Sequence, residues 1–347
     1  LQLGAKRIGW ARRKAIPGAG SGPLKRGIGV ASGLWYDTGR PGAEIRVTIN
    51  QDATVEVFSG AQDIGTGTRT ILGQVVAEEL GLPLSSVQVH LGKTRWPYGP
   101  GSGGSKITPT LAPTARRAAY HVKLKLFEAA RRLLAVSPKT PLVARGGAIA
   151  IAKGRSKAGS KRVPLQKVLA TFAGKSVSAQ ERRPANFKRW QAHVGGVQFA
   201  EVEVDTRTGI IRPIKIVAVH DCGRVLNPLT ARSQLNGGVL QGLSYALLEE
   251  RILDSQTGCM TNPNLEQYKI AGALDTPEID GVLFDVYMGS NNTGAIGLGE
   301  PVTIPTAGAV ANAVFNAIGV QVRELPMTPS RVLAALGRTK PGAGGQP

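Results

Sequence analysis

The feature that most constrains the fold is a pattern that occurs twice: a β-hairpin, a turn that contains glycine, and then a helix. The first hairpin is predicted over Glu44–Asn50 and Thr54–Ser59, where apolar and polar residues alternate. The second is predicted over Val197–Asp205 and Ile211–His220. Hairpins and helices in this order favour an α+β fold. We therefore predict two subdomains, each a hairpin sheet with packed helices, whose glycine turns converge on one site.

The remaining elements complete this pattern. Further strands are predicted over Ile28–Tyr36, Val87–Leu91, Gly146–Lys153 and Gly281–Met288. Helices are predicted from Ile71 to Leu80 and from the end of the loop at residues 97–108 to about Leu134. Three more are predicted over Pro164–Phe172, Val302–Ile318 and Pro329–Leu336. Irregular chain is predicted over Lys175–Arg189, and an exposed basic loop over Gly154–Arg162.

These elements suggest a division of the chain into four parts. Residues 1–26 are basic and interrupted by Gly and Pro, which predicts a connector. A first subdomain is expected over 27–195, and a second one over 196–337. Residues 338–347 are rich in Gly and Pro, which predicts a flexible tail.

The composition indicates a globular chain with a basic surface. The 347 residues are 42% hydrophobic, and no apolar run reaches membrane-spanning length. The formal net charge is +20, but the basic residues are spread along the chain and aromatic residues make up only 5%. We interpret the charge as a surface property that suits acidic partner subunits, with nucleic-acid binding as a less favoured alternative.

The cysteines and the first residues of the chain give information on the cellular location of the protein. The two cysteines, Cys222 and Cys259, give neither a disulfide framework nor a metal-ligand spacing. The chain starts at Leu1 without a charged and then apolar leader, so no signal peptide is expected, and a start without Met indicates a processed or partial chain. The expected location is the cytoplasm, or the periplasm if the chain is exported with a partner.

Two glycine-rich loops each run directly into a helix. The first is Gly60–Thr68, with Gly65 and Gly67, and the second is residues 97–108. Backbone N–H groups at a helix start favour an anion. In the second loop Ser102, Ser105 and Thr108 offer hydroxyl groups and Lys106 offers a charge. The alternatives are a tight strand-to-helix turn for the first loop and a flexible linker for the second.

The stretch Gly294–Pro301 holds a single carboxylate, Glu300, between glycines and a proline. Glycine allows close approach of the backbone, and proline is tolerated in the first turn of a helix. The stretch therefore predicts a carboxylate fixed at a helix start and facing a ligand. The alternative is an acidic residue that merely stabilises the helix dipole. Gln234 lies on a predicted helix, and the alternative to a role in the site is that its amide is exposed on the helix surface.

Together these loops resemble the molybdenum-binding subunit of the xanthine dehydrogenase and aldehyde oxidase family. Gly60–Thr70 is similar to the family's Gly-Gln-Gly loop, and Ser102–Thr108 to its hydroxyl-rich cofactor loop. His220–Gly238 resembles its Asp-x-Gly, Leu-Asn-Pro and Gln-x-x-Gly segment, and Gly297–Pro301 its Gly-x-Gly-Glu-Pro motif. Thr66 stands where the family loop has glutamine. The resemblance covers only the C-terminal half of the family's molybdenum subunit.

The resemblance implies a fold, a cofactor and a reaction. Both subdomains would bind molybdopterin, as the cytosine dinucleotide with molybdenum, and the protein would give the metal no ligand. An aldehyde or an N-heterocycle would be hydroxylated with oxygen from water. Glu300 would be the base, and Gln234 would donate to the metal's oxo group. The cofactor-binding residues would be Gly65, Thr66, Gly67, Ser102, Gly104, Ser105, Thr108, Gln234, Gly297 and Gly299.

The resemblance also implies partners. The N-terminal half of the molybdenum subunit, an FAD subunit and a [2Fe–2S] subunit would complete the enzyme, since two cysteines cannot hold a cluster. Two other functions stay open from the sequence: a non-catalytic scaffold subunit of such a complex, and a basic nucleic-acid-binding protein. Glu300 and Gln234 argue against the scaffold, which needs neither.

Overall fold

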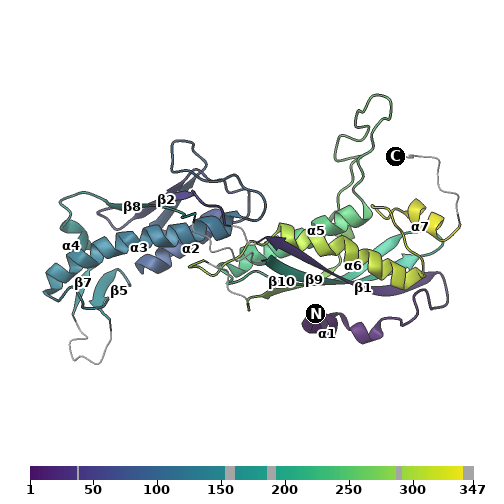
Figure 1. Ribbon diagram of the computed structural model, residues 1–347, viewed down its shortest axis with the longest axis horizontal. Helices are drawn as coiled ribbons and strands as arrows, with labels where there is room; N and C mark the ends of the chain where they lie inside the picture. The colour runs from purple at the N-terminus through teal and green to yellow at the C-terminus, as the bar shows by residue number, and fades with distance from the viewer. Residues whose placement is uncertain (37–38, 153–160, 186–192, 287–290, 339–347) are drawn as a thin grey trace.

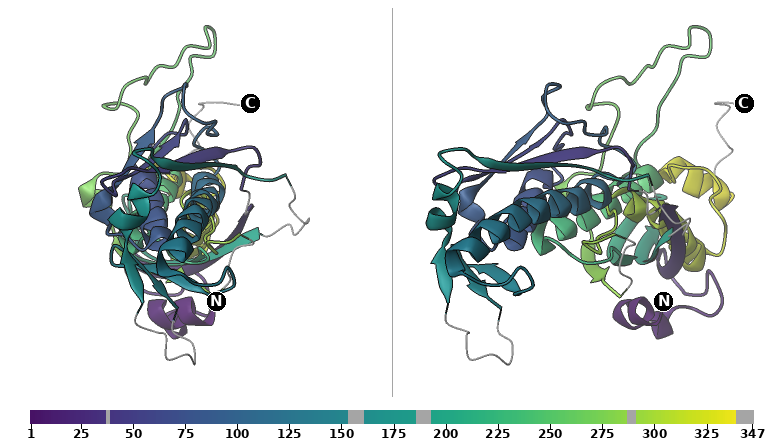
Figure 2. Two further views of the ribbon diagram at one scale, coloured as in Figure 1. Left: turned by 90° about the vertical axis from the view of Figure 1, so that its left-hand side faces the viewer. Right: turned by 60° about the vertical axis from the view of Figure 1, so that its left-hand side comes forward.

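The computed structural model describes residues 1–36, 39–152, 161–185, 193–286 and 291–338. The molecule has two lobes that lie end to end along its longest axis (Figure 1), and a view turned by 60° also shows them side by side (Figure 2). The first lobe is formed by residues 39–185, and the second lobe by residues 1–36 together with 193–338. The first lobe is therefore an insertion between two strands of the second lobe.

The second lobe is built on a four-stranded sheet in the order β1-β9-β10-β11. Its strands are β1 (Leu24–Tyr36), β9 (His193–Asp205), β10 (Ile211–Asp221) and β11 (Glu278–Phe284). Neighbours are antiparallel except β10 and β11, which are parallel. Successive side chains on a strand point to opposite faces. Both faces of this sheet are apolar and both are covered.

Helices cover the two faces unequally. The long helices α5 (Pro228–Leu247) and α6 (Glu300–Ile318) pack on one face with Ala200, Val202 and Val204 of β9, and the short α7 (Pro329–Ala335) joins this core. On the other face, α1 (Gln2–Ile8) and the 3-10 turn η1 (Trp10–Arg12) pack against Phe199. The rings of Trp10 and Phe199 meet edge to face, with centroids 5.5 Å apart.

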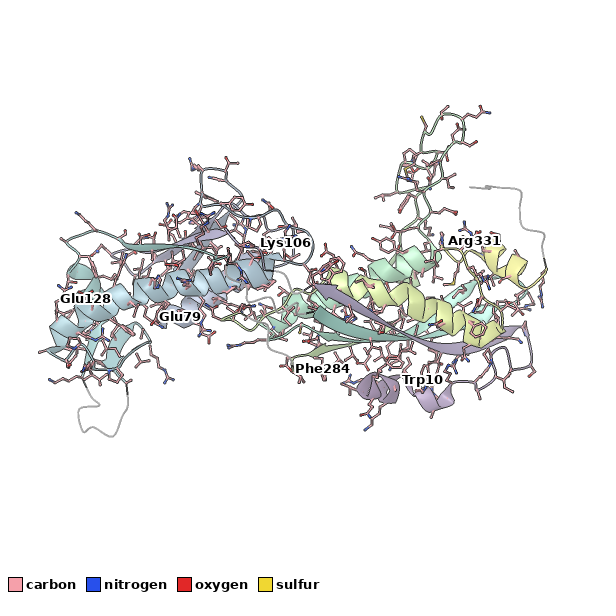
Figure 3. The ribbon with its side chains drawn as sticks, viewed as in Figure 1. Trp10, Glu79, Lys106, Glu128, Phe284 and Arg331 are labelled. Atoms are coloured by element: carbon pink, nitrogen blue, oxygen red, sulfur yellow. The ribbon has the colours of Figure 1, made fainter. Side chains whose placement is uncertain are left out.

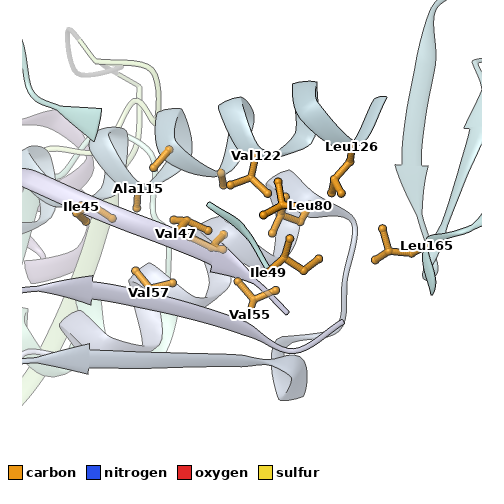
Figure 4. Packing of buried hydrophobic residues seen from close by; sticks show 14 of the residues in the cluster. Ile45, Val47, Ile49, Val55, Val57, Leu80, Ala115, Val122, Leu126 and Leu165 are labelled. Carbon is orange, nitrogen blue, oxygen red and sulfur yellow. The ribbon is translucent and has the colours of Figure 1, made fainter. Parts of the chain in front are cut away.

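The first lobe has its own sheet, in the order β4-β3-β2-β8. Its strands are β2 (Glu44–Ile49), β3 (Val55–Ser59), β4 (Val87–Leu91) and β8 (Val177–Arg182). The helices α2 (Thr68–Leu80) and α3 (Ile107–Leu134) cover one face, toward which Ile45, Val47 and Ile49 point (Figure 4). A small sheet and further short elements complete the lobe: β5 (Leu142–Arg145), β6 (Ala148–Ile151), β7 (Arg162–Pro164), α4 (Leu165–Ala170) and η2 (Leu84–Ser86).

The α+β fold and both predicted hairpins are confirmed. The predicted division at residue 27 differs from the strand pairing, because β1 pairs along its length with β9 and so belongs to the second lobe. Residues 1–26 are more than a connector, since α1 packs on the sheet and Ile8 is 1% exposed. The prediction of irregular chain over Lys175–Arg189 is wrong for Val177–Arg182, which is strand β8 paired with β2.

Some predicted elements fall partly or wholly outside the described residues. These are most of the basic loop at 154–162, the end of the strand predicted to Met288, and the tail after residue 338. None of the helices in the described ranges combines the length and the apolar character needed to cross a membrane.

A buried polar network joins the sheet of the second lobe to the start of α6. The side chain of Gln198 on β9 donates to the carbonyl of Val302 (2.6 Å) and accepts from the hydroxyl of Thr306 (2.7 Å). Its amide nitrogen also lies 3.1 Å from Nε2 of His220, so that ring nitrogen accepts and the imidazole is neutral. Burial lowers the pKa of His220 from 6.5 to about 4.

This network predicts a pH-dependent stability. Folded His220 stays neutral down to about pH 4, whereas the unfolded chain takes up a proton as the pH falls through 6.5. The free energy of unfolding should therefore fall by about 3 kcal/mol at most between these values. His220→Gln, measured by urea unfolding from pH 7 to pH 4, should have a shallower pH dependence than the wild type. Equal slopes would contradict the assignment.

Candidate functional site

A cavity of about 370 Å³ lies at the junction of the two lobes. Four helices begin at its wall: α2 after Gly67, α3 after Lys106, α5 after Asn227 and α6 after Gly299. Lys106 lies at this junction in Figure 3. Helix starts leave backbone N–H groups without intrahelical partners and carry a partial positive charge. The two glycine loops and the Glu300 stretch are thus brought together, as the sequence predicted.

Glu300 is the carboxylate of this cavity, and the first lobe holds it. The N–H of Gly104 donates to its Oε1 and the hydroxyl of Ser105 donates to its Oε2, both at 2.7 Å. The backbone N–H of Glu300 donates to the same hydroxyl oxygen at 3.1 Å. Both carboxylate oxygens therefore have fixed partners, while the half-buried side chain still lines the cavity.

Glycine is required at residue 297 because a side chain there would run into the carbonyl of Ser105. This contact brings the backbones of the two lobes together beside the cavity. Gly299 has φ 131°, which side chains rarely adopt, and precedes α6 directly. Glu300 can follow so tight a turn because Gly299 precedes it directly.

One face of α5 packs against the start of α6, and this packing places Gln234 on the wall of the cavity. Gly238 and Gly242 face Val302 and Thr306 at distances that leave no room for a Cβ atom. Gln234 lies one turn earlier on the same face, and its Oε1 is 3.0 Å from the place a Cβ on Gly299 would take. Among the described residues its side chain has no hydrogen-bond partner, so its amide is available to a ligand.

The structure places most predicted site residues on the cavity wall. These are Thr66, Ser102, Ser105, Thr108, Gln234, Gly297, Gly299 and Glu300. Gly65, Gly67 and Gly104 are not among the lining residues. Gly67 instead has φ 84°, and a Cβ there would lie 2.6 Å from a methyl group of Thr230 on α5, so packing between the lobes accounts for this glycine.

The loop hydroxyls differ in their availability. Ser102 is bonded to Gln62, through its N–H at 3.0 Å and its hydroxyl at 3.1 Å. Ser105 is engaged by Glu300. Within the described part of the chain, the hydroxyl of Thr108 has no hydrogen-bond partner. Thr108, which the structure places in the first turn of α3, is therefore free to meet a ligand, whereas Ser105 is not.

Sequence reasoning assigned no role to several further lining residues. These are Ile64, Cys222, Arg224, Asn227, Thr230 and Gln241. Gln241 lies seven residues after Gln234, two helical turns along the same face, so helical spacing could have found it. Cys222 is buried, and burial raises the pKa of its thiol to about 12, so it stays protonated.

The donor set suits an anionic ligand that is rich in nitrogen and oxygen atoms. The wall offers hydroxyls, side-chain amides, the cations of Lys106 and Arg224, and the four helix starts. No group of three or more His, Cys, Asp or Glu in the described ranges is placed to hold a metal ion. Fold and cavity together indicate a binding site for a polar, anionic ligand between two α+β lobes.

The chain belongs to the molybdopterin cofactor-binding domain family, whose model matches residues 3–277. It is 33% identical, over 344 residues, to the putative xanthine dehydrogenase molybdenum-binding subunit XdhA of Escherichia coli (strain K12), covering 96% of this chain and 45% of that protein. It is 34% identical to the aldehyde oxidoreductase molybdenum-binding subunit PaoC of the same strain, covering 97% of this chain and 44% of that protein. The chain thus spans about half the length of these relatives.

The fold is also similar to solved structures. Quinoline 2-oxidoreductase from Pseudomonas putida 86 superimposes with a TM-score of 0.81 at 26% identity, covering 97% of this chain and 43% of that one. The Cu,Mo-CO dehydrogenase superimposes with a TM-score of 0.82 at 22% identity, a likeness of fold alone. The predicted resemblance is thereby confirmed.

Two adjacent glycines of α5 test the packing that places Gln234. Gly238→Ala would put a Cβ 2.6 Å from Cβ of Val302, so we expect a loss of about 1–3 kcal/mol in the free energy of unfolding. Gly237→Ala meets nothing within 4 Å and should stabilise the helix by about 1 kcal/mol. Denaturant unfolding measures both. A Gly238→Ala variant as stable as the wild type would rule out the close crossing.

Proposed function

We propose that this chain is the cofactor-binding, base-carrying part of a molybdenum hydroxylase, which hydroxylates an aldehyde or an N-heterocycle with oxygen from water. The observation that carries the proposal is Glu300, a carboxylate held by Gly104 and Ser105 on the wall of a cavity that suits the cofactor. Membership of the cofactor-binding family and relatives that are molybdenum-binding subunits support it.

The residues of the cavity fit the cofactor by their chemistry. Lys106, Arg224 and the helix starts are placed to neutralise phosphate charge, and Thr66 and Thr108 offer hydroxyls to a pterin. Gln234, whose side chain has no hydrogen-bond partner among the described residues, offers its amide beside Gly299. We propose the cytosine dinucleotide form, in line with the family resemblance and the bacterial relatives. When bound, the cofactor supplies the two-electron oxidising centre.

Glu300 does the proton chemistry in this proposal. Its carboxylate accepts a proton on Oε1 or Oε2, and the hydrogen bonds from Gly104 and Ser105 keep both oxygens on the cavity wall. Gln234 donates a hydrogen bond into the cavity, where negative charge develops. The apolar side chains of Ile296 and Leu298 line the same wall.

Glu300→Gln should abolish most turnover while keeping the cofactor. Glutamine preserves the shape and one acceptor oxygen but takes up no proton, so kcat should fall by about 10²–10⁴-fold. The complex is assayed with an aromatic aldehyde and with quinoline, using an artificial electron acceptor, and its molybdenum and pterin contents are measured. Glu128→Gln, the same change at a residue whose side chain is 75% exposed, is the control. Full turnover in Glu300→Gln with normal cofactor content would refute the role.

We further propose that the chain works only with partner proteins. It spans less than half of its relatives, and its exposed segment 249–277 stands away from the second lobe (Figure 2). Large apolar side chains of this segment are in water, with Leu265 at 74% and Leu274 at 103% exposure. We propose that the N-terminal half of a molybdenum subunit covers it. Flavin and iron–sulfur partners would take the electrons, because Cys222 is buried and Cys259 is the only other cysteine.

Co-expression tests this assembly. The chain alone should bind little cofactor, and co-expression with the N-terminal half should restore molybdenum and pterin, because neither half encloses the ligand by itself. Leu265→Glu with Leu274→Glu should weaken co-purification at least tenfold. Leu133→Glu, at a half-exposed leucine of α3 in the first lobe, is the control and should have no effect. A chain that binds cofactor and turns over without a partner would contradict the proposal.

A further inference from the structure

Helix α6 begins without a capping side chain of its own. Its N-cap residue is Gly299, so the first N–H groups of the helix lack the acceptor that Ser, Thr, Asp or Asn usually provides. The acceptor comes from the other lobe instead, because the N–H of Glu300 donates to the hydroxyl oxygen of Ser105 at 3.1 Å. That hydroxyl in turn donates to Oε2 of Glu300 at 2.7 Å. One hydroxyl thus binds both the backbone and the carboxylate of the same residue.

The backbone of Ser105 is held in an unfavourable conformation to make these bonds. Its φ is +53°, in the left-handed region, although it is not glycine. The neighbouring Gly104 is fixed on both sides: its N–H donates to Glu300, and its carbonyl accepts from the indole of Trp35 on β1 at 3.2 Å. The carbonyl of Ser105 itself fits against Gly297. Contacts from the second lobe therefore hold the strained residue in place.

We propose that Ser105 is the positioning residue of Glu300, clamping the carboxylate from the opposite lobe. This inference rests on the proposed role of Glu300. Ser105 is followed directly by Lys106, the N-cap of α3, and by Thr108 in the first turn of that helix, and both of these residues line the cavity. The position of the base is consequently set by the loop that faces the ligand, and neither lobe alone orients Glu300 for proton transfer.

Hydrogen–deuterium exchange tests the clamp without requiring any activity. In Ser105→Ala, the backbone amide of Glu300 loses its acceptor and should exchange about fivefold faster, the factor that a typical net hydrogen bond implies. Ser86→Ala, the same change at a serine of the first lobe that does not line the cavity, should leave this amide unchanged. Unchanged exchange at Glu300 in Ser105→Ala would overturn the capping role.

Kinetics of the assembled complex test the effect on catalysis. Ser105→Ala and Ser105→Gly should both lower kcat at least tenfold, with KM for an aromatic aldehyde within twofold and cofactor content unchanged. Glycine relieves the backbone strain at φ +53° but lacks the hydroxyl. If Ser105→Gly kept the wild-type kcat while Ser105→Ala did not, the loss in Ser105→Ala would be due to backbone strain, and the inference would be overturned.

Glu300→Gln separates the two proposals. If Glu300→Gln is inactive while both Ser105 variants keep the wild-type kcat, the clamp is refuted and the role of Glu300 stands. If Glu300→Gln is active, the proposed base itself fails. Faster amide exchange with a tenfold lower kcat in both Ser105 variants, together with an inactive Glu300→Gln, supports both.

Discussion

Unpaired N–H groups at helix starts are the constraint on which this structure depends. The helices α2, α3, α5 and α6 all begin at one cavity, so many backbone donors need partners there at once. Asn227 caps α5 from within its own segment, whereas α6 relies on Ser105 from the other lobe. In α2 the N–H of Arg69 donates to the carboxylate of Asp63, which lies in the loop before this helix. An anionic cofactor is the partner that would satisfy donors and dipoles together.

The site is also a joint between two separate hydrophobic cores. Each lobe buries its own sheet under its own helices. Near the cavity the lobes meet through glycines, polar groups and one small apolar cluster, in which Leu226 packs against Ile71, Val75 and Ala112. The backbones of the two lobes can approach where Gly297 meets Ser105 and where Gly67 meets Thr230. The hydrogen bonds to the Glu300 carboxylate then fix the position of one lobe relative to the other. Stability and site geometry are therefore separable. The hydrophobic cores stabilise the fold of each lobe, and a few contacts between the lobes fix the position of Glu300.

The sequence predicted the elements better than it predicted their partners. Alternation of apolar and polar residues located β2, β3, β9 and β10, because that period is local. The strand predicted over Ile28–Tyr36 is most of β1, but its partner β9 could not be predicted, because β9 follows the whole first lobe in the sequence. The loops with Glu300, Gln234 and Thr108 were found from glycine and proline patterns and from family resemblance. The engagement of Ser105 by Glu300 is a contact between distant segments, and no local pattern could have indicated it.

The insertion of the first lobe between β1 and β9 affects how the chain is made. During synthesis β1 emerges before the whole first lobe and cannot form its ladder until β9 follows. In that interval its N–H and C=O groups are unpaired, and apolar side chains such as Ile28 are uncovered, which exposes the strand to pairing with other chains. The first lobe contains all the strands of its own sheets, so it is able to fold meanwhile. Slow translation through the first lobe would lengthen the period in which β1 is unprotected, and the yield of folded protein would fall with it.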